Sequence, residues 1–296
     1  MPAAHVKTTT TRTLRALAAV AAVALLAACG PTQPAAPPAA TAPANPYGHI
    51  HGMTVDPDTG HVLLATHNGL FNATASPVEQ ISPTIDLMGF ATTADPGHYY
   101  ASGHPGPGSD LPDPVGLIHS NDGGETWEPL SRQGESDFHA MTSTRDGIIG
   151  YDGQIRRTKD GRSWTTIKAD FQPFALAGSP TGAVVLATTE QGLQRSGNGG
   201  TTWEQPANAP LLVFTAFADS ATVAGVATDN TVHISRDAGR TWQPRGSVSG
   251  QPAAIAATAG NGSEEATQIW VATTSGLEHS QDNGATFTPV GNGNLP

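Results

Sequence analysis

The stretch SNDGGETW, residues 120–127, is the first of five copies of one short motif. The others are TKDGRSW from Thr158, SGNGGTTW from Ser196, SRDAGRTW from Ser235 and SQDNGATF from Ser280. Successive copies start 38, 38, 39 and 45 residues apart. A nearly fixed period of this length is typical of a protein built from one repeated structural unit. The fold can therefore be predicted from the structure expected for one repeat unit.

Each unit contains the same order of short segments. In the fourth unit these are PFALAGS (173–179), AVVLATT (183–189), GLQRS (192–196), the motif, and a last segment after Trp203. Alternating apolar residues, 34 glycines and 24 prolines favour short strands joined by tight turns. A sixth unit without the motif begins at His49. Four strands in about 40 residues form a propeller blade, so the sequence predicts an all-β, six-bladed β-propeller over 47–296, with seven blades as the alternative.

The motif resembles the Asp-box, or BNR repeat, of sialidases, sortilin-like proteins and many secreted propellers, which are often labelled glycosyl hydrolases or exo-sialidases. The resemblance covers residues from about 49 to 290. We expect the acidic side chain to accept backbone N–H bonds in the turn between the third and fourth strands, and the aromatic ring to pack against a blade. Asn198 replaces the acid in one copy and the copy at Thr158 is one residue shorter, so we expect these two turns to be looser.

The first 29 residues predict a bacterial lipoprotein signal peptide. Lys7, Arg12 and Arg15 form a basic head, residues 16–28 are apolar, and the run ends in LAAC. This ending resembles a lipobox, in which Cys29 would be lipidated. Residues 30–46 are nearly all Pro, Ala, Thr, Gln and Asn, a composition typical of an extended tether. We therefore expect a lipid anchor to hold the propeller at the extracytoplasmic face of the cell membrane.

The charge of the remaining chain limits its partners. The signal holds three of the 14 basic residues and none of the 25 acidic ones, which leaves 11 against 25, a formal charge of −14. This excess of acidic residues excludes a basic surface for nucleic acid. It favours a cation as the ligand. A protein or glycan of the cell envelope is a further expected partner.

A group of polar side chains aligns at the starts of the innermost strands. Aligning the blades by their second strands places His51, Met88, His139 and Phe174 in one column, and His49, Asp86, Asp137 and Gln172 two residues earlier. Residues two apart in a strand share a face. His67 and His104 end second strands, which antiparallel pairing brings beside the starts of the first strands.

Imidazole, carboxylate and thioether groups in one place predict a transition-metal site. Histidine with aspartate suits zinc, whereas histidine with methionine suits copper. The site is expected on the face of the disc opposite the motif. Its predicted ligands are His49, His51, His67, His104, His139, Asp86 and Met88.

A carboxylate glycosidase in the same channel is the alternative function. Its candidate catalytic pair is Asp86 and Asp137, although the sequence does not give the separation that decides such a mechanism. Sialidases also need three arginines for the substrate carboxylate, and no arginine lies on a predicted inner strand. Whether the protein is an enzyme is left open by these residues, but sialidase activity is expected to be absent.

Overall fold

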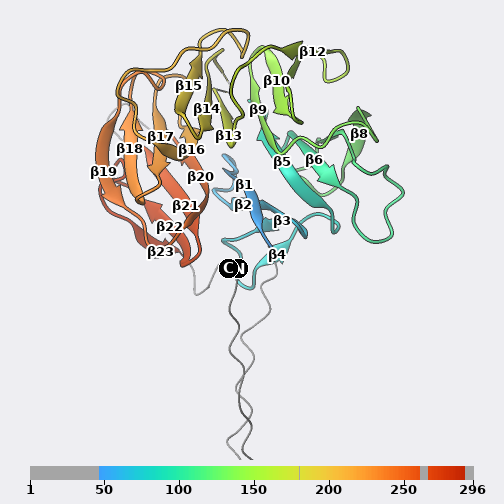
Figure 1. Ribbon diagram of the computed structural model, residues 1–296. Helices are drawn as coiled ribbons and strands as arrows, with labels where there is room; N and C mark the ends of the chain where they lie inside the picture. Colours follow the sequence, from blue (N-terminus) through green and yellow to red (C-terminus); the bar gives the residue numbers. More distant parts are fainter. Residues whose placement is uncertain (1–46, 180, 261–265, 291–296) are drawn as a thin grey trace, which may run out of the picture. The chain divides into compact units, whose positions relative to one another are not determined.

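Six small antiparallel sheets make up the part of the chain that the computed structural model describes, which is residues 47–179, 181–260 and 266–290. Figure 1 shows the sheets arranged around a central axis, with the first strand of each sheet innermost. Neighbouring inner strands contact one another around the whole ring, including β20 with β1. The predicted all-β, six-bladed propeller is therefore confirmed, and the seven-bladed alternative is wrong.

Each blade consists of strands that are consecutive in the sequence. Blade one contains β1 (Ile50–Val55), β2 (Val62–Thr66), β3 (Gly69–Asn72) and β4 (Glu79–Gln80). Blade two contains β5 (Asp86–Thr92), β6 (Tyr99–His104), β7 (Leu117–Ser120) and β8 (Glu128–Ser131). Blade three contains β9 (Ala140–Thr144), β10 (Gly147–Tyr151), β11 (Ile155–Thr158) and β12 (Trp164–Ile167). Blade four contains β13 (Ala175–Gly178), β14 (Val185–Thr189) and β15 (Gly192–Ser196). Blade five contains β16 (Leu212–Phe217), β17 (Val223–Ala227), β18 (Thr231–Ser235) and β19 (Gln243–Ser247). Blade six contains β20 (Pro252–Thr258), β21 (Gln268–Thr273), β22 (Gly276–Ser280) and β23 (Thr288–Val290).

Residues 1–46, which carry the predicted signal peptide, Cys29 and the tether, lie outside the described residues. Within the described ranges, no helix has the length and apolar character needed to cross a membrane.

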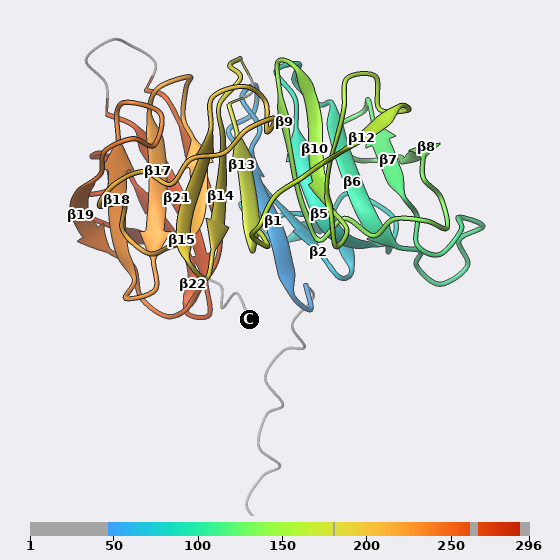
Figure 2. The same cartoon turned by 45° about the horizontal axis from the view of Figure 1, so that its top comes forward.

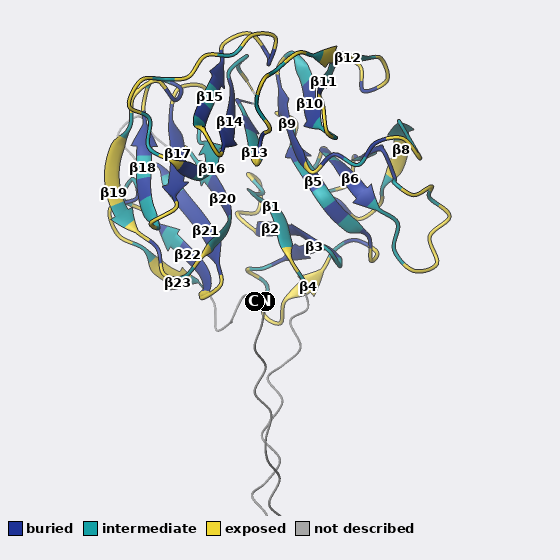
Figure 3. Ribbon diagram, viewed as in Figure 1, coloured by how far each residue is buried: buried dark blue, intermediate teal, exposed yellow. Residues whose placement is uncertain are grey.

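The hydrophobic core is divided among the interfaces between blades. In the described part of the chain, each of six buried clusters joins residues of two neighbouring blades. Figure 3 shows the second strands deeply buried and outermost strands such as β4 and β19 exposed. A blade alone would leave both of its apolar faces in water, so burial of these faces favours the closed ring.

The aromatic residue of each motif packs between its own blade and the blade before it. Trp164, for example, joins the cluster of Leu117 and Phe138 between blades two and three, and its ring centroid lies 4.9 Å from that of Phe138. The corresponding residues of the five copies are Trp127, Trp164, Trp203, Trp242 and Phe287. We call these five motif segments the repeat turns, because each lies directly after a third strand.

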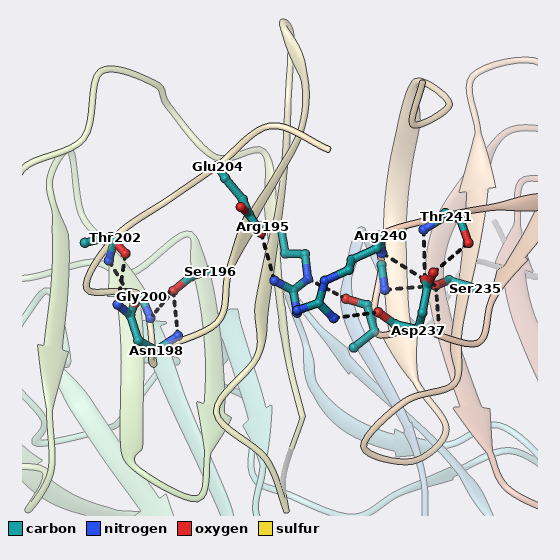
Figure 4. Close-up of polar contacts among 12 residues, drawn as sticks. Arg195, Ser196, Asn198, Gly200, Thr202, Glu204, Ser235, Asp237, Arg240 and Thr241 are labelled. Carbon is teal, nitrogen blue, oxygen red and sulfur yellow. Dashed lines mark hydrogen bonds and ion pairs between the residues drawn. The ribbon is translucent and has the colours of Figure 1, made fainter. Parts of the chain in front are cut away.

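The repeat turns are held by hydrogen bonds to the acidic or amide side chain. Asp237 Oδ1 accepts the backbone N–H bonds of Arg240 at 3.0 Å and Thr241 at 2.8 Å, as Figure 4 shows. Asn198 Oδ1 accepts the N–H of Thr202 at 2.9 Å in the same way. In the shorter copy, Asp160 Oδ1 accepts two backbone N–H bonds at 2.9 and 2.7 Å. Both of these turns thus retain backbone bonds to the side chain, and whether they are looser stays a prediction.

Strand register places the repeat turns and the predicted site on opposite faces. In blade two, Asp86 at the start of β5 pairs with His104, whereas Thr92 at its end pairs with Tyr99, which in turn pairs with Ser120 of the repeat turn. Figure 2 shows the strands of each blade running between the two faces of the disc. The starts of the inner strands therefore form one mouth of the central channel.

Candidate metal centre

A cavity of about 340 Å³ lies along the axis and is lined by the inner strands of all six blades. The aligned column of residues lines this cavity at the mouth where those strands begin: His51, Met88, His139 and Phe174. The channel mouth is thus polar on blades one and three and aromatic on blade four.

His51, His67 and Asp86 form a group that could hold a metal ion. One ligand atom from each lies within 4.8 Å of the others. The Nε2 atoms of His51 and His67 lie 4.0 and 3.9 Å from Asp86 Oδ1. We call these three residues the His51 triad.

The backbone brings the triad together. His51 lies in β1, and the N–H of His67 donates to the carbonyl of His49 at 3.1 Å, which fixes the end of the second strand beside the start of the first. The rings of His51 and His67 stack with centroids 4.5 Å apart. Asp86 opens β5, which packs against β1.

Two atoms of the triad are buried without a hydrogen-bond partner among the described residues. They are His51 Nε2 and Asp86 Oδ1. A buried polar atom left unpaired costs about 1–3 kcal/mol, so such pairs are rare in stable folds. Their separation of 4.0 Å is too long for a hydrogen bond. Ligands around a tetrahedral ion with bonds of about 2.1 Å lie roughly 3.4 Å apart, which a small inward movement of these side chains would achieve.

The electrostatic state of the triad suits a cation. Burial, together with the nearby imidazoles of His67, His49 and His139, lowers the pKa of His51 to about 4. Burial raises the pKa of Asp86, against the opposing influence of the nearby histidines. His51 is therefore neutral at physiological pH, which is the form that ligates metals. A divalent ion would supply the positive charge that the buried carboxyl group of Asp86 needs when it ionises.

A second cluster of polar side chains lies around Asp137, and most of its polar atoms pair with one another. Asp137 Oδ2 lies 2.6 Å from Nε2 of His139 and 3.3 Å from Nε2 of His104. His104 also donates from Nδ1 to Asp113 Oδ1 at 2.6 Å, and this bond raises the pKa of His104. Asp137 Oδ1 remains buried and unpartnered among the described residues.

Three of the seven predicted ligands thus fall into one ligand group, and the other four are not part of it. His49 packs beside His67 with ring centroids 4.9 Å apart, and Met88 lines the cavity. His104 and His139 contact Asp137 instead. Sequence reasoning missed Asp113, which lies in the Pro- and Gly-rich insertion of blade two. The carboxylates that closely follow His104 in that insertion were the available signal.

Arginine is absent from the six inner strands, all of which lie within the described residues. Arg156 and Arg157 lie in β11, Arg195 lies in β15, and Arg236 follows β18. These are the third strands, as the sequence predicted. The absence of sialidase activity itself stays a prediction.

Solved structures match this chain, although no protein-family model and no curated protein does. A GH74 xyloglucanase from Xanthomonas campestris matches with a TM-score of 0.58 and 14% identity, over 83% of this chain and 38% of that chain. A GH74 enzyme from Niastella koreensis matches with a TM-score of 0.54 and 16% identity, over 83% and 38%. YCF48, in a structure bound to D1 peptide, matches with a TM-score of 0.50 and 20% identity, over 82% of both chains.

At these identities the likeness shows the β-propeller fold alone. The neighbours include both a hydrolase and a propeller bound to a peptide, so the fold is compatible with either kind of activity. This chain spans only 38% of the length of each of the two GH74 proteins. The resemblance to BNR or Asp-box families stays a prediction from the motif.

Proposed function

We propose that the protein is a binding propeller of the cell envelope whose channel mouth holds a divalent transition-metal ion. The ion would be bound by His51, His67 and Asp86. The single observation that carries this proposal is the pair of buried, unpartnered atoms His51 Nε2 and Asp86 Oδ1, which face each other at 4.0 Å. An ion between them would satisfy both.

The donor set favours zinc over copper. Two imidazoles and one carboxylate are ligands that zinc accepts, with a fourth position left for water or a bound molecule. Copper would be favoured by the thioether of Met88, which lines the same cavity but is not part of the ligand group. Zinc is therefore the first ion to test.

Isothermal titration calorimetry of the propeller with zinc and with copper tests the proposal. We expect one tight zinc site in the wild type and at least a 100-fold loss of affinity in the double variant His51→Ala, His67→Ala. The matched control is His61→Ala, His98→Ala, which removes two histidines outside the site. A thermal melt of each variant checks folding. Equal zinc affinity in both double variants, or none in the wild type, would contradict the proposal.

The membrane anchor is part of the same proposal. The lipobox at Cys29, followed by a Pro- and Ala-rich segment, supports a lipid that holds the propeller at the extracytoplasmic face of the membrane, where an envelope protein or glycan is the proposed partner. Replacing Cys29→Ser should release the protein from the membrane fraction or leave its signal uncleaved. Normal processing with unchanged membrane retention would contradict lipidation.

A carboxylate glycosidase is the second candidate function. The observation that favours it is the raised pKa of Asp86, which a general acid requires, together with the nearby charge of Asp137 at the same channel mouth. The GH74 neighbours share only the fold. Hydrolysis of aryl glycosides by zinc-free protein, lost in both Asp86→Asn and Asp137→Asn, would support this function. No turnover of a fluorogenic sialoside is expected in either case, because the inner strands carry no arginine.

A further inference from the structure

An exposed aromatic ring lines the cavity that His51 of the proposed metal centre also lines. The Phe174 side chain is 62% exposed, more than any other large hydrophobic residue in the described part of the chain. Phe174 and Phe214 both line the cavity, and their ring centroids lie 5.4 Å apart at an interplanar angle of 54°. Apolar surface exposed inside a concave opening, rather than on a convex surface, is typical of a ligand site.

Hydrogen bonds within blade four, and one from blade four to blade five, fix the backbone beside the two rings. The N–H of Phe174 donates to the carbonyl of Thr188 at 2.7 Å. Thr188 Oγ1 accepts the N–H of Ala175 at 3.2 Å and donates to the carbonyl of Val213, the residue before Phe214, at 2.8 Å. The backbone that carries Phe174, and that of Val213 beside Phe214, is therefore ordered before any ligand arrives, which reduces the entropy lost on binding.

The volume of the cavity and the charge of the bound ion limit the size and the charge of the ligand. A volume of about 340 Å³ is near the lower end of the range for small-molecule pockets, so it accommodates one or two rings. Within its own ligand set, a divalent ion bound by the single carboxylate of Asp86 keeps one net positive charge, while the carboxylate of Asp137 contacts His104 and His139 instead. Three protein donors also leave a coordination position open. A monoanion would fill that position and neutralise that charge.

We infer that the channel mouth binds a small planar aromatic monoanion, with its ring against Phe174 and Phe214 and its carboxylate on the ion of the His51 triad. His51 and the two phenylalanines line one cavity, so the ring and the carboxylate of a bound molecule would share that space. This inference rests on the proposed metal site.

Binding of naphthoate to the zinc-loaded protein, followed by its fluorescence, tests the inference. Phe174→Ala should weaken naphthoate about 5- to 10-fold, the loss expected for one aromatic contact, while leaving zinc affinity unchanged. Leu211→Ala is the matched control, because Leu211 is also exposed but lies outside the cavity lining. Cyclohexanecarboxylate, which lacks the planar ring, should bind more weakly than naphthoate.

Each outcome separates this inference from the metal proposal. Zinc binding without naphthoate binding, or equal naphthoate affinity in wild type and Phe174→Ala, overturns the inference and leaves the metal proposal standing. Absence of zinc binding by calorimetry overturns both proposals. Naphthoate binding that is lost in the His51→Ala, His67→Ala variant and weakened in Phe174→Ala supports the inference.

Discussion

Asp237 and Asn198 close equivalent turns with different chemistry. Both accept the N–H of the residue four positions later, but only aspartate carries a charge. Burial acts to raise the pKa of Asp237, yet the bonds from Thr241, Ser235 and Arg240 outweigh it and hold the pKa at about 2. Bonds from Thr126 lower the pKa of Asp122 to about 2 in the same manner. The repeat turns therefore link stability to acid pH.

The first prediction concerns this acid dependence. Because the folded-state pKa of Asp237 lies below its unfolded value of about 3.9, its contribution is present above pH 4 and is lost as pH falls toward about 2. Asp237→Asn should cost less than about 1 kcal/mol at pH 7, since the amide keeps the bond as Asn198 does, and should flatten the fall in melting temperature between pH 4 and pH 2. The reverse variant Asn198→Asp should steepen it. Identical pH profiles for all three proteins would contradict this account.

The second prediction concerns the glycine of the repeat turn. Gly124 has a φ of +93°, and a Cβ there would overlap Cδ2 of Leu70 on the preceding blade. Gly124→Ala should therefore lower the free energy of unfolding by about 2–4 kcal/mol through backbone strain and overpacking together. The adjacent Gly123 has a φ of +75° with nothing within 4 Å, so Gly123→Ala should cost only about 1–2 kcal/mol. Urea unfolding measures both, and an equal loss would show that packing against Leu70 is unimportant.

At the scale of the element, blade four differs from the others because its described residues form only three regular strands. A single bridge between Arg195 and Glu204 stands in its place. Arg195 is 3% exposed and donates to Glu204 Oε1 at 3.0 Å and to the carbonyl of Ala238, in the repeat turn of blade five, at 2.8 Å. Figure 4 shows Arg195 between the two blades. One side chain thus connects the outer edge of blade four to its neighbour.

The third prediction follows from this connection. Arg195→Met should cost about 2–4 kcal/mol, because it leaves the carbonyl of Ala238 unpaired and removes the hydrogen bonds of a buried guanidinium group. Glu204→Gln should cost about 1 kcal/mol or less, since the Glu204 side chain is 66% exposed and its charge is well solvated. Chemical denaturation measures the free energy of unfolding of both variants and shows which loses more. A larger loss in Glu204→Gln would contradict the role given to Arg195.

At the scale of the whole propeller, the ring closes without exchange of a strand between blades one and six. Closure depends instead on a hydrophobic cluster that includes Tyr47, Phe71 and Trp270. The Tyr47 and Phe71 rings meet edge to face with centroids 5.2 Å apart. Blade one has no repeat turn, and these aromatic residues occupy the interface that the motif tryptophan or phenylalanine fills elsewhere.

The fourth prediction tests this mode of closure. Phe71→Ala should cost about 3–5 kcal/mol and should speed hydrogen exchange mainly in β1–β4 and β20–β23. Phe138→Ala, in the cluster between blades two and three, should cost a similar amount but speed exchange mainly in β5–β12. Faster exchange in the same strands for both variants would contradict local control of closure.

The fold could be predicted from the sequence because the motif, the period and the strand order repeat. Repetition also supported the alignment that places His51, Met88 and His139 at one channel mouth. The division of the histidines into two groups could not be predicted, because it depends on side-chain directions at the strand starts. The contact between Asp113 and His104 depends on the path of an insertion that no other blade contains.

The central claim is that His51, His67 and Asp86 bind one transition-metal ion. Anomalous diffraction at the zinc absorption edge, from crystals grown with zinc, tests this claim most directly. The account predicts one strong peak about 2.0–2.2 Å from Nε2 of His51, Nε2 of His67 and a carboxylate oxygen of Asp86. A strong peak elsewhere with none between these three atoms, or no ordered zinc at all, would contradict it.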